Sequence, residues 1–205
     1  MIDLASMSLD DGVPIEAVAE YLDRLSPASR RDEAASMKRK HQRALFRKAL
    51  AAPKVGLADF VPPDVDPKTP VRHFGKNTLP LPGKHQFFEK RFARPDDGTD
   101  RLFGYNHAPS KGLIGPGYFV AVPTDGNPLW TERGPIVIDY FQVPDGAVPA
   151  GWPTVVPNSK GLQVLVYHRT RDFMRKVSAH VTIGAAHKGE KALDHYFMLV
   201  REAPV

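Results

Sequence analysis

The first helical pattern along the chain runs from Pro14 to Leu25. Within it Ile15, Val18 and Leu22 recur at three- and four-residue steps, which places them on one stripe of a helix. Pro14 suits the first turn, where its missing N–H removes no hydrogen bond. The spacing therefore predicts an amphipathic helix over these residues.

A second helix is predicted from about Ala28 to Ala51. Ser26 followed by Pro27 is a typical helix start, with a side-chain cap and then proline at the first helical position. Large apolar residues are sparse in this segment and form only a thin stripe. We expect this helix to pack lightly and to expose a basic face.

The next segment, residues 52–70, is rich in proline. Its five prolines are Pro53, Pro62, Pro63, Pro67 and Pro70. Proline lacks a backbone donor and restricts the residue before it, so neither a regular helix nor a central strand fits here. The segment is predicted to be an extended connector.

From Val71 onward, short apolar or alternating runs are separated by turn residues, a pattern typical of antiparallel sheets. Strands are predicted near Val71–Phe74, His85–Phe92, Arg101–Asn106, Tyr118–Val122, Ile136–Phe141, His180–Ala186 and His195–Val200. The Lys-Gly-Glu-Lys sequence at 188–191 is predicted to join the last two strands as a hairpin.

One segment, Gly161 to Val177, departs from this pattern. Leu162, Leu165 and Phe173 are spaced more like a helix than like an alternating strand. We expect a helix packed on the sheet, although residues 164–167 also fit a strand.

Together these elements predict an α+β protein. A short N-terminal helical segment (residues 1–51) and a proline-rich connector (52–70) precede an antiparallel β-rich domain (71–205). The domain is expected to be a curved antiparallel sheet or a partly closed β-barrel with one packed helix near its C-terminus.

The composition of the chain excludes several kinds of chemistry but does not identify a reaction. The chain has no Cys, which excludes disulfides, thiolate metal sites and Cys nucleophiles. The N-terminus carries acidic residues where a secretion signal would be basic and then apolar, and no apolar run is long enough to span a membrane. We expect a cytoplasmic protein.

Charge is unevenly distributed along the chain. Eight bases and two acids between Arg30 and Lys48 give this stretch more positive charge than the whole chain, whose net charge is +5. An acidic protein or a nucleic acid would be attracted to such a helix; a solvated helix face is the simpler interpretation. The residues expected to meet an anionic partner are Arg31, Lys38, Arg39, Lys40, Arg43 and Arg47.

A polar minority on apolar strands marks a candidate ligand pocket. Asp139 interrupts the apolar run 135–141, so it should be partly buried and paired with an Arg, a His, a Tyr hydroxyl or a ligand. Tyr105 and His107 lie at the end of a predicted strand, where ligand sites often form. With His180 they are the candidate ligand-binding residues, and a buried ion pair is the simpler interpretation of Asp139.

The remaining sequence patterns mainly exclude particular kinds of functional site. The glycine run 112–117 precedes a strand and lacks the Gly-Lys-Ser/Thr ending of a phosphate-binding loop, so a tight turn is expected. No histidine spacing supports a metal site, no serine-nucleophile motif is present, and no motif names a cofactor. The bases and aromatics between His85 and Phe92 fit a single-stranded nucleic-acid surface or an ordinary strand.

The sequence thus favours a β domain that binds a small apolar or amphipathic ligand on the concave face of its sheet and that could be an enzyme of unknown reaction. The alternative is an interaction or nucleic-acid-associated module that docks through its basic helix. The two classes differ in the feature that they require: a lined cavity for the first, a continuous positive surface for the second.

Overall fold

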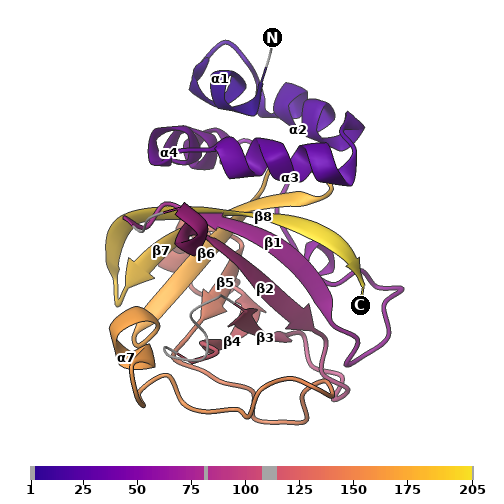
Figure 1. Ribbon diagram of the computed structural model, residues 1–205, viewed down its shortest axis with the longest axis vertical. Coiled ribbons are helices and arrows are strands. Elements are labelled where there is room, and N and C mark those ends of the chain that lie inside the picture. The colour runs from indigo at the N-terminus through magenta and orange to yellow at the C-terminus, as the bar shows by residue number, and fades with distance from the viewer. Residues whose placement is uncertain (1–2, 81–82, 108–114, 205) are drawn as a thin grey trace.

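The computed structural model describes residues 3–80, 83–107 and 115–204 of the chain. Residues 108–114 lie outside this description, so the turn expected for the glycine run is described only at Gly115–Gly117. A closed antiparallel β-barrel lies beneath a layer of helices (Figure 1).

The barrel has eight strands in sequence order, each antiparallel to the next. They are β1 (Val71–Asn77), β2 (Phe87–Ala93), β3 (Leu102–His107), β4 (Tyr118–Pro123), β5 (Ile136–Asp139), β6 (Thr170–Lys176), β7 (Val181–Lys188) and β8 (Lys191–Pro204). The long strand β8 pairs with β7 on one side and with β1 on the other, which closes the sheet. The expectation of a partly closed barrel was therefore wrong, while the antiparallel β-rich architecture is confirmed.

The seven predicted strands are all present, with ends that differ by a few residues, and the 188–191 hairpin is confirmed. The segment 161–177 was predicted wrongly as one helix. It forms a four-residue helix, α7 (Gln163–Val166), followed by strand β6. Both faces of β6 are covered, so Phe173 and Met174 are equally buried and the two-residue alternation disappears from the sequence.

Four short helices form the N-terminal layer: α1 (Leu4–Leu9), α2 (Ile15–Arg24), α3 (Pro27–Ser36) and α4 (Arg39–Lys48). Helix α2 agrees with the sequence pattern, and the Ser26 side chain caps α3 as expected by accepting from Ser29 N at 3.1 Å. The helix predicted from 28 to 51 is broken at Met37 and Lys38, which are extended. The break lets the buried Met37 enter the core between the helices and the sheet.

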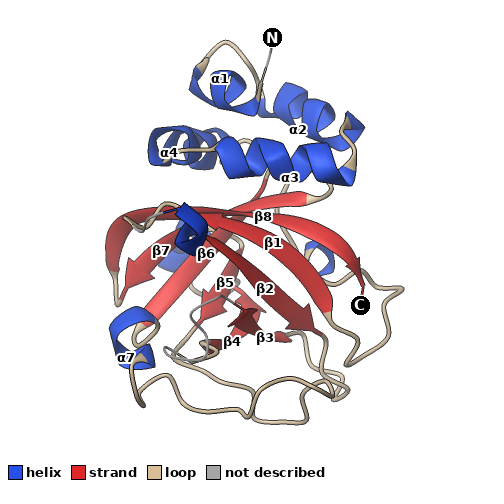
Figure 2. Ribbon diagram, viewed as in Figure 1, coloured by secondary structure: helices blue, strands red, loops and turns tan. Residues whose placement is uncertain are grey.

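The helices pack on the outer face of the barrel and share an apolar cluster with it. Leu22, Met37 and Leu45 from the helices meet Ile183 and Met198 from the strands. Figure 2 shows the helices lying across β1 and β8. This contact holds the N-terminal segment on the barrel, while the division of the chain at residues 51 and 70 stays a prediction.

The proline-rich connector contains one 3-10 turn, η1 (Leu57–Asp59). Phe60 and Val61 belong to the apolar cluster inside the barrel. Two basic side chains from the strands bind Asp59. Lys176 Nζ lies 2.7 Å from its carboxylate, and Arg201 donates to its backbone carbonyl at 2.8 Å. A further 3-10 turn, η2 (Gly83–Gln86), precedes β2, and helix α6 (Pro128–Arg133) lies between β4 and β5.

Candidate functional site

The barrel interior contains a polar cluster of four residues: Lys90, Asn106, Tyr140 and Asp172. Lys90 on β2 lies directly across from Asn106 on β3, and its Nζ donates to Asn106 Oδ1 at 2.9 Å. The same Nζ contacts the Tyr140 hydroxyl and lies 3.5 Å from Asp172 Oδ2. Asn106 Nδ2 donates to the Tyr140 hydroxyl at 3.1 Å, so the four side chains form one connected network.

Four aromatic rings surround the Lys90 ammonium. Their centroids lie 4.9 to 5.6 Å from Nζ, and they belong to Phe88, Phe119, Tyr140 and Phe197. At these distances the ring faces of Phe88, Phe119 and Phe197 attract a cation, whereas Tyr140 meets the ammonium through its hydroxyl. The lysine side chain is 2% exposed, so its charge is balanced by this shell and by Asp172 rather than by water.

Glycines on neighbouring strands make room for three of these rings. A Cβ at Gly75, Gly104 or Gly184 would collide with the ring of Phe88, Phe119 or Phe197, respectively. Each glycine therefore lets an aromatic ring lie close against the strand backbone. The aromatic shell depends on residues from six strands and on Tyr140 just after β5, and no continuous sequence motif encodes it.

Burial changes the acid–base behaviour of the cluster. Desolvation lowers the pKa of Lys90 to about 8, although Asp172 opposes the change. Desolvation also raises the pKa of Asp172, with Lys90 acting in the opposite direction, and it raises the pKa of Tyr140 well above its usual value. The amine can thus lose its proton near neutral pH with a carboxylate and a phenol in contact with it.

The cluster is covered by residues of α7 and of the turn that follows it. The ring of Tyr167 stacks on that of Tyr140, with centroids 5.3 Å apart and planes at 18°. Gln163, at the start of α7, accepts a hydrogen bond from Gly117 N at 2.9 Å. Tyr167 is half-buried, whereas Tyr140 beneath it is buried, so Tyr167 lies between the cluster and the surface.

Asp139 lies on the opposite face of β5 from the barrel interior. Its carboxylate lies 3.3 Å from Arg171 Nε, accepts from Phe141 N at 2.9 Å and accepts from the Gln142 side chain at 3.2 Å. The guanidinium of Arg171 also lies over the rings of Phe141 and Trp130. Asp139 is thus held in a buried ion pair, the simpler of its two interpretations, and its proposed role with a ligand stays a prediction.

The structure brings Tyr105 and His107 together but not with the other two candidates. Both lie on the outer face of β3, with ring centroids 6.2 Å apart, and Tyr105 also packs edge-on against Trp152 at 4.9 Å. His180 lies in the turn between β6 and β7, where burial lowers its pKa. Asp139 on β5, Tyr105 and His107 on β3, and His180 in the β6–β7 turn belong to three different parts of the fold, and a pocket that joins all four stays a prediction.

Half of the bases expected to meet an anionic partner contact the barrel. Arg31 lies 2.9 Å from Glu202, Arg39 donates to Thr78 O at 2.9 Å, and Arg43 pairs with Asp194. The other three, Lys38, Lys40 and Arg47, are exposed. Part of the positive charge thus attaches the helices to the strands.

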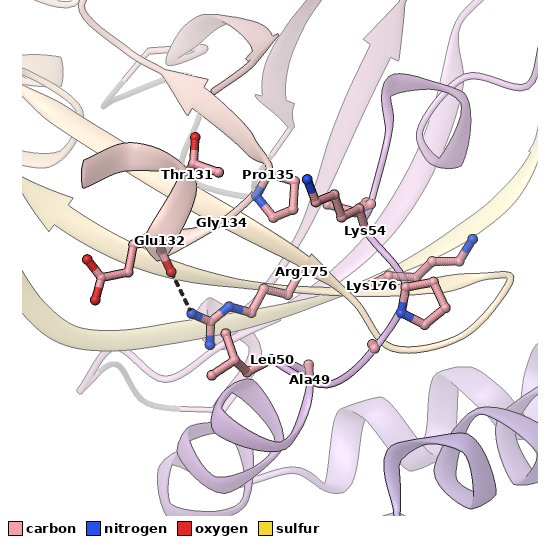
Figure 3. Close-up of a pocket in the computed structure, with 12 residues that line it drawn as sticks. Ala49, Leu50, Lys54, Thr131, Glu132, Gly134, Pro135, Arg175 and Lys176 are labelled. Atoms are coloured by element: carbon pink, nitrogen blue, oxygen red, sulfur yellow. Dashed lines mark hydrogen bonds between the residues drawn. The ribbon is translucent and has the colours of Figure 1, made fainter. Parts of the chain in front are cut away.

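Two surface hollows lie outside the barrel. The first, of about 140 Å³, lies where the segment after α4 meets α6 and β6, and Figure 3 shows Arg175 there donating to the Glu132 carbonyl. The second, of about 290 Å³, is lined by residues such as Leu57, Arg94 and Leu102. Arg94 and Arg175 both donate to backbone carbonyls, and Arg101, which also lines the second hollow, pairs with Asp97 and Asp145.

The described residues include no group of three or more His, Asp or Glu side chains arranged to hold a metal ion. Within the same ranges, each helix is too short or too polar to cross a membrane. Comparisons with protein-family models, with curated proteins and with solved structures found no match. Function must therefore be inferred from the site.

The bases and aromatics between His85 and Phe92 were expected on a nucleic-acid surface or in an ordinary strand, whereas Lys90 lies inside the barrel. The signal was available, because a single base flanked by two phenylalanines at two-residue steps is unusual on a solvated face. Its partners Asn106, Tyr140 and Asp172 come from three other strand regions and become neighbours only when the barrel closes.

Proposed function

We propose that the barrel binds a small carbonyl compound through the amine of Lys90. The observation that carries the proposal is the fully enclosed lysine whose Nζ contacts Asn106, Tyr140 and Asp172 within an aromatic shell. Burying a charge is costly, and perturbed ionisable groups gather at functional sites. The proposal keeps the expected ligand-binding β domain and places its site inside the closed barrel.

The chemistry open to this amine is imine formation. The neutral Nζ attacks the carbonyl carbon, the C–N bond forms, and the carbonyl oxygen becomes the hydroxyl of a carbinolamine. The carbinolamine then loses this hydroxyl as water while Nζ gives up its remaining proton, which leaves a C=N double bond. Amine and carbonyl thus become imine and water, and no oxidant or reductant is needed.

The neighbours of Lys90 suit the proton movements in these steps. Asp172 can take each of the two protons that Nζ loses and pass it to the oxygen, the first to form the carbinolamine hydroxyl and the second to release that hydroxyl as water. Tyr140 and Asn106 can donate hydrogen bonds to the developing alkoxide oxygen. The aromatic shell excludes water, which favours the imine over its hydrolysis.

The lowered pKa of Lys90 would make it the preferred amine near neutral pH. A group with a pKa of about 8 is roughly 10% neutral at pH 7, whereas an ordinary lysine is neutral to well under 0.1%. The larger neutral fraction favours reaction at Lys90, whereas the burial of this residue restricts the access of an aldehyde to it. The larger neutral fraction also gives the proposal a measurable signature.

The test is reductive trapping with a small aldehyde. The protein is incubated at pH 7 with butanal and cyanoborohydride, which converts an imine to a stable butyl amine, and the modified lysines are located by peptide mass spectrometry. We expect butylation at Lys90 to precede that of the other lysines. The controls are Lys90→Arg, which keeps the charge but forms no imine, and Lys54→Arg on the surface.

Loss of the fastest-forming adduct in Lys90→Arg but not in Lys54→Arg would support the proposal. The same adduct pattern in all three proteins would overturn it. Circular dichroism of each variant confirms that the barrel is folded before labelling.

The second candidate is docking of an acidic protein or nucleic acid on the helical layer. It is favoured by the exposure of Lys38, Lys40 and Arg47, whose side chains remain available to a phosphate or carboxylate. Binding to a polyanion such as heparin that weakens with salt, and that is lost in the triple Ala variant, would support it. Binding that is unchanged in this variant would exclude it.

A further inference from the structure

The segment that covers the Lys90 cluster has a turn of unusual backbone conformation at each end. Gly161 has a φ of 62° and Arg169 a φ of 60°, both in the left-handed region. Glycine adopts this region freely, but for arginine it is uncommon and costs energy. Residues 161–169 are therefore a short segment bounded by two sharp turns, with helix α7 between them.

Helix α7 itself makes few contacts with the barrel, and the rest of the segment is held by Tyr167, which packs against the interior cluster, and by Gly189 N, which donates to Arg169 O at 2.8 Å. Of the four residues of α7 only Gln163 is buried, and it accepts from Gly117 N. Leu162, Leu165 and Val166 face solvent, and Leu165 is 75% exposed. Elements with so little buried surface open at a low cost in free energy.

The main inward contact of the segment is the ring of Tyr167. One face of this ring stacks on Tyr140, and the ring also lies against the backbone of Gly117, where a Cβ would collide with it. Tyr140 in turn contacts Lys90 Nζ through its hydroxyl. Tyr167 thus fills a flat slot against Tyr140, whose hydroxyl contacts the amine.

From this geometry we infer that the slot of Tyr167 is the binding place for a planar aromatic ring, and that the ligand of Lys90 is an aromatic aldehyde or ketone. The carbonyl group of this ligand rests on the proposed function. Its aromatic ring rests on the packing of Tyr167 against Tyr140 and Gly117. When residues 161–169 swing outward, the ligand ring replaces Tyr167 on Tyr140. Its carbonyl then points toward Lys90.

The slot can be tested without any lysine chemistry. Tyr167→Ala removes the ring and leaves a cavity of the same shape, and p-cresol is the side chain that was removed. Apolar cavities of this kind bind aromatic molecules that match them. We expect p-cresol to raise the melting temperature of Tyr167→Ala, but not that of the wild type or of Leu165→Ala, a matched change on the same segment.

The ligand class is tested by trapping with benzaldehyde and with butanal in the same three proteins. In Tyr167→Ala, labelling of Lys90 by benzaldehyde should rise relative to labelling by butanal by about fivefold, as one stacking contact of about 1 kcal/mol supplies. In Leu165→Ala the ratio should equal that of the wild type.

The outcomes separate the two proposals. If p-cresol stabilises Tyr167→Ala but neither aldehyde labels Lys90, the proposed function fails and the aromatic slot stands. If Lys90 is labelled but p-cresol has no effect and the aldehyde ratio is unchanged, the aromatic slot fails and the reactive lysine stands. Stabilisation together with the changed ratio supports both.

Discussion

Lys90 and Asp172 form an ion pair inside the barrel, with Nζ 3.5 Å from Oδ2 and side chains that are 2% and 7% exposed. The attraction between two buried charges offsets only part of the free-energy cost of removing both from water. Leaving either charge buried without its partner destabilises the protein more. The pKa of each partner is displaced toward its neutral form by burial. The pair therefore makes a specific prediction about single and double substitutions.

Lys90→Met and Asp172→Leu should each destabilise the protein by about 3 to 5 kcal/mol, because each leaves one buried ionisable group without its partner. The double variant should lie close to the wild type or exceed it. Urea unfolding of the four proteins measures the coupling free energy. Additive losses in the double variant would contradict a direct interaction between the two side chains.

Gly75 and Phe88 give a second prediction, which concerns the aromatic shell. A Cβ at position 75 meets only ring atoms of Phe88 among its three nearest neighbours, so Gly75→Ala should cost about 1 to 3 kcal/mol by overpacking. Phe88→Leu removes those atoms, and the double variant should be more stable than the sum of the single losses predicts. Urea unfolding provides all three values.

Gly146→Ala is the matched control for this series. The nearest atom to its added Cβ is 3.7 Å away in Phe103, an ordinary contact. Its stability should equal or slightly exceed that of the wild type, because alanine reduces the freedom of the unfolded chain. A loss at position 146 as large as that at position 75 would show that the glycine effect is not due to the ring.

The strands of this fold could be predicted from sequence because their residues alternate or form short apolar runs between turns. Strand β6 could not, because Phe173 and Met174 are both buried and the sequence carries no alternation there. The break at Met37 was missed because helix propensity continues through it, while the burial of Met37 in the shared core decides the local conformation.

The candidate site was less predictable than the strands. Asp139 was expected to be partly buried, but sequence alone does not tell which face of a strand covered on both sides points inward. Lys90, Asn106 and Asp172 are separated by up to 82 residues and meet only through barrel closure. Their chemistry depends on how the strands pair in the closed barrel, and no local sequence motif encodes that pairing.

Leu45 and Leu50 give a prediction about the attachment of the helical layer. Leu45 is fully buried in the cluster shared by helices and strands, whereas Leu50, just beyond α4, is 69% exposed. Leu45→Ala should cost about 2 to 5 kcal/mol, and Leu50→Ala should change stability by less than about 0.5 kcal/mol. Chemical denaturation of the two variants checks this difference. A loss in Leu45→Ala as small as that in Leu50→Ala would mean that the helices contribute little to the stability of the barrel.

His73 makes the last prediction, which concerns acid. Its ring is completely buried, with Nε2 3.0 Å from the Phe60 carbonyl oxygen and Nδ1 without a partner among the described residues. Desolvation lowers its pKa to about 3, with Arg201 and Lys90 adding to the shift. The folded protein therefore keeps this histidine neutral at pH values where the unfolded chain, with a pKa near 6.5, binds a proton.

Because the unfolded state binds more protons between pH 3 and pH 6.5, stability rises with pH through this window and is lost as the pH falls through it. His73 alone accounts for a loss of about 5 kcal/mol over the window, or about 1.4 kcal/mol for each pH unit. His73→Gln keeps a donor for the Phe60 carbonyl but cannot take up the proton. Its stability should therefore depend less steeply on pH, by about one proton, when urea unfolding is measured between pH 4 and pH 6. An unchanged slope in His73→Gln would show that another group is responsible for the acid sensitivity.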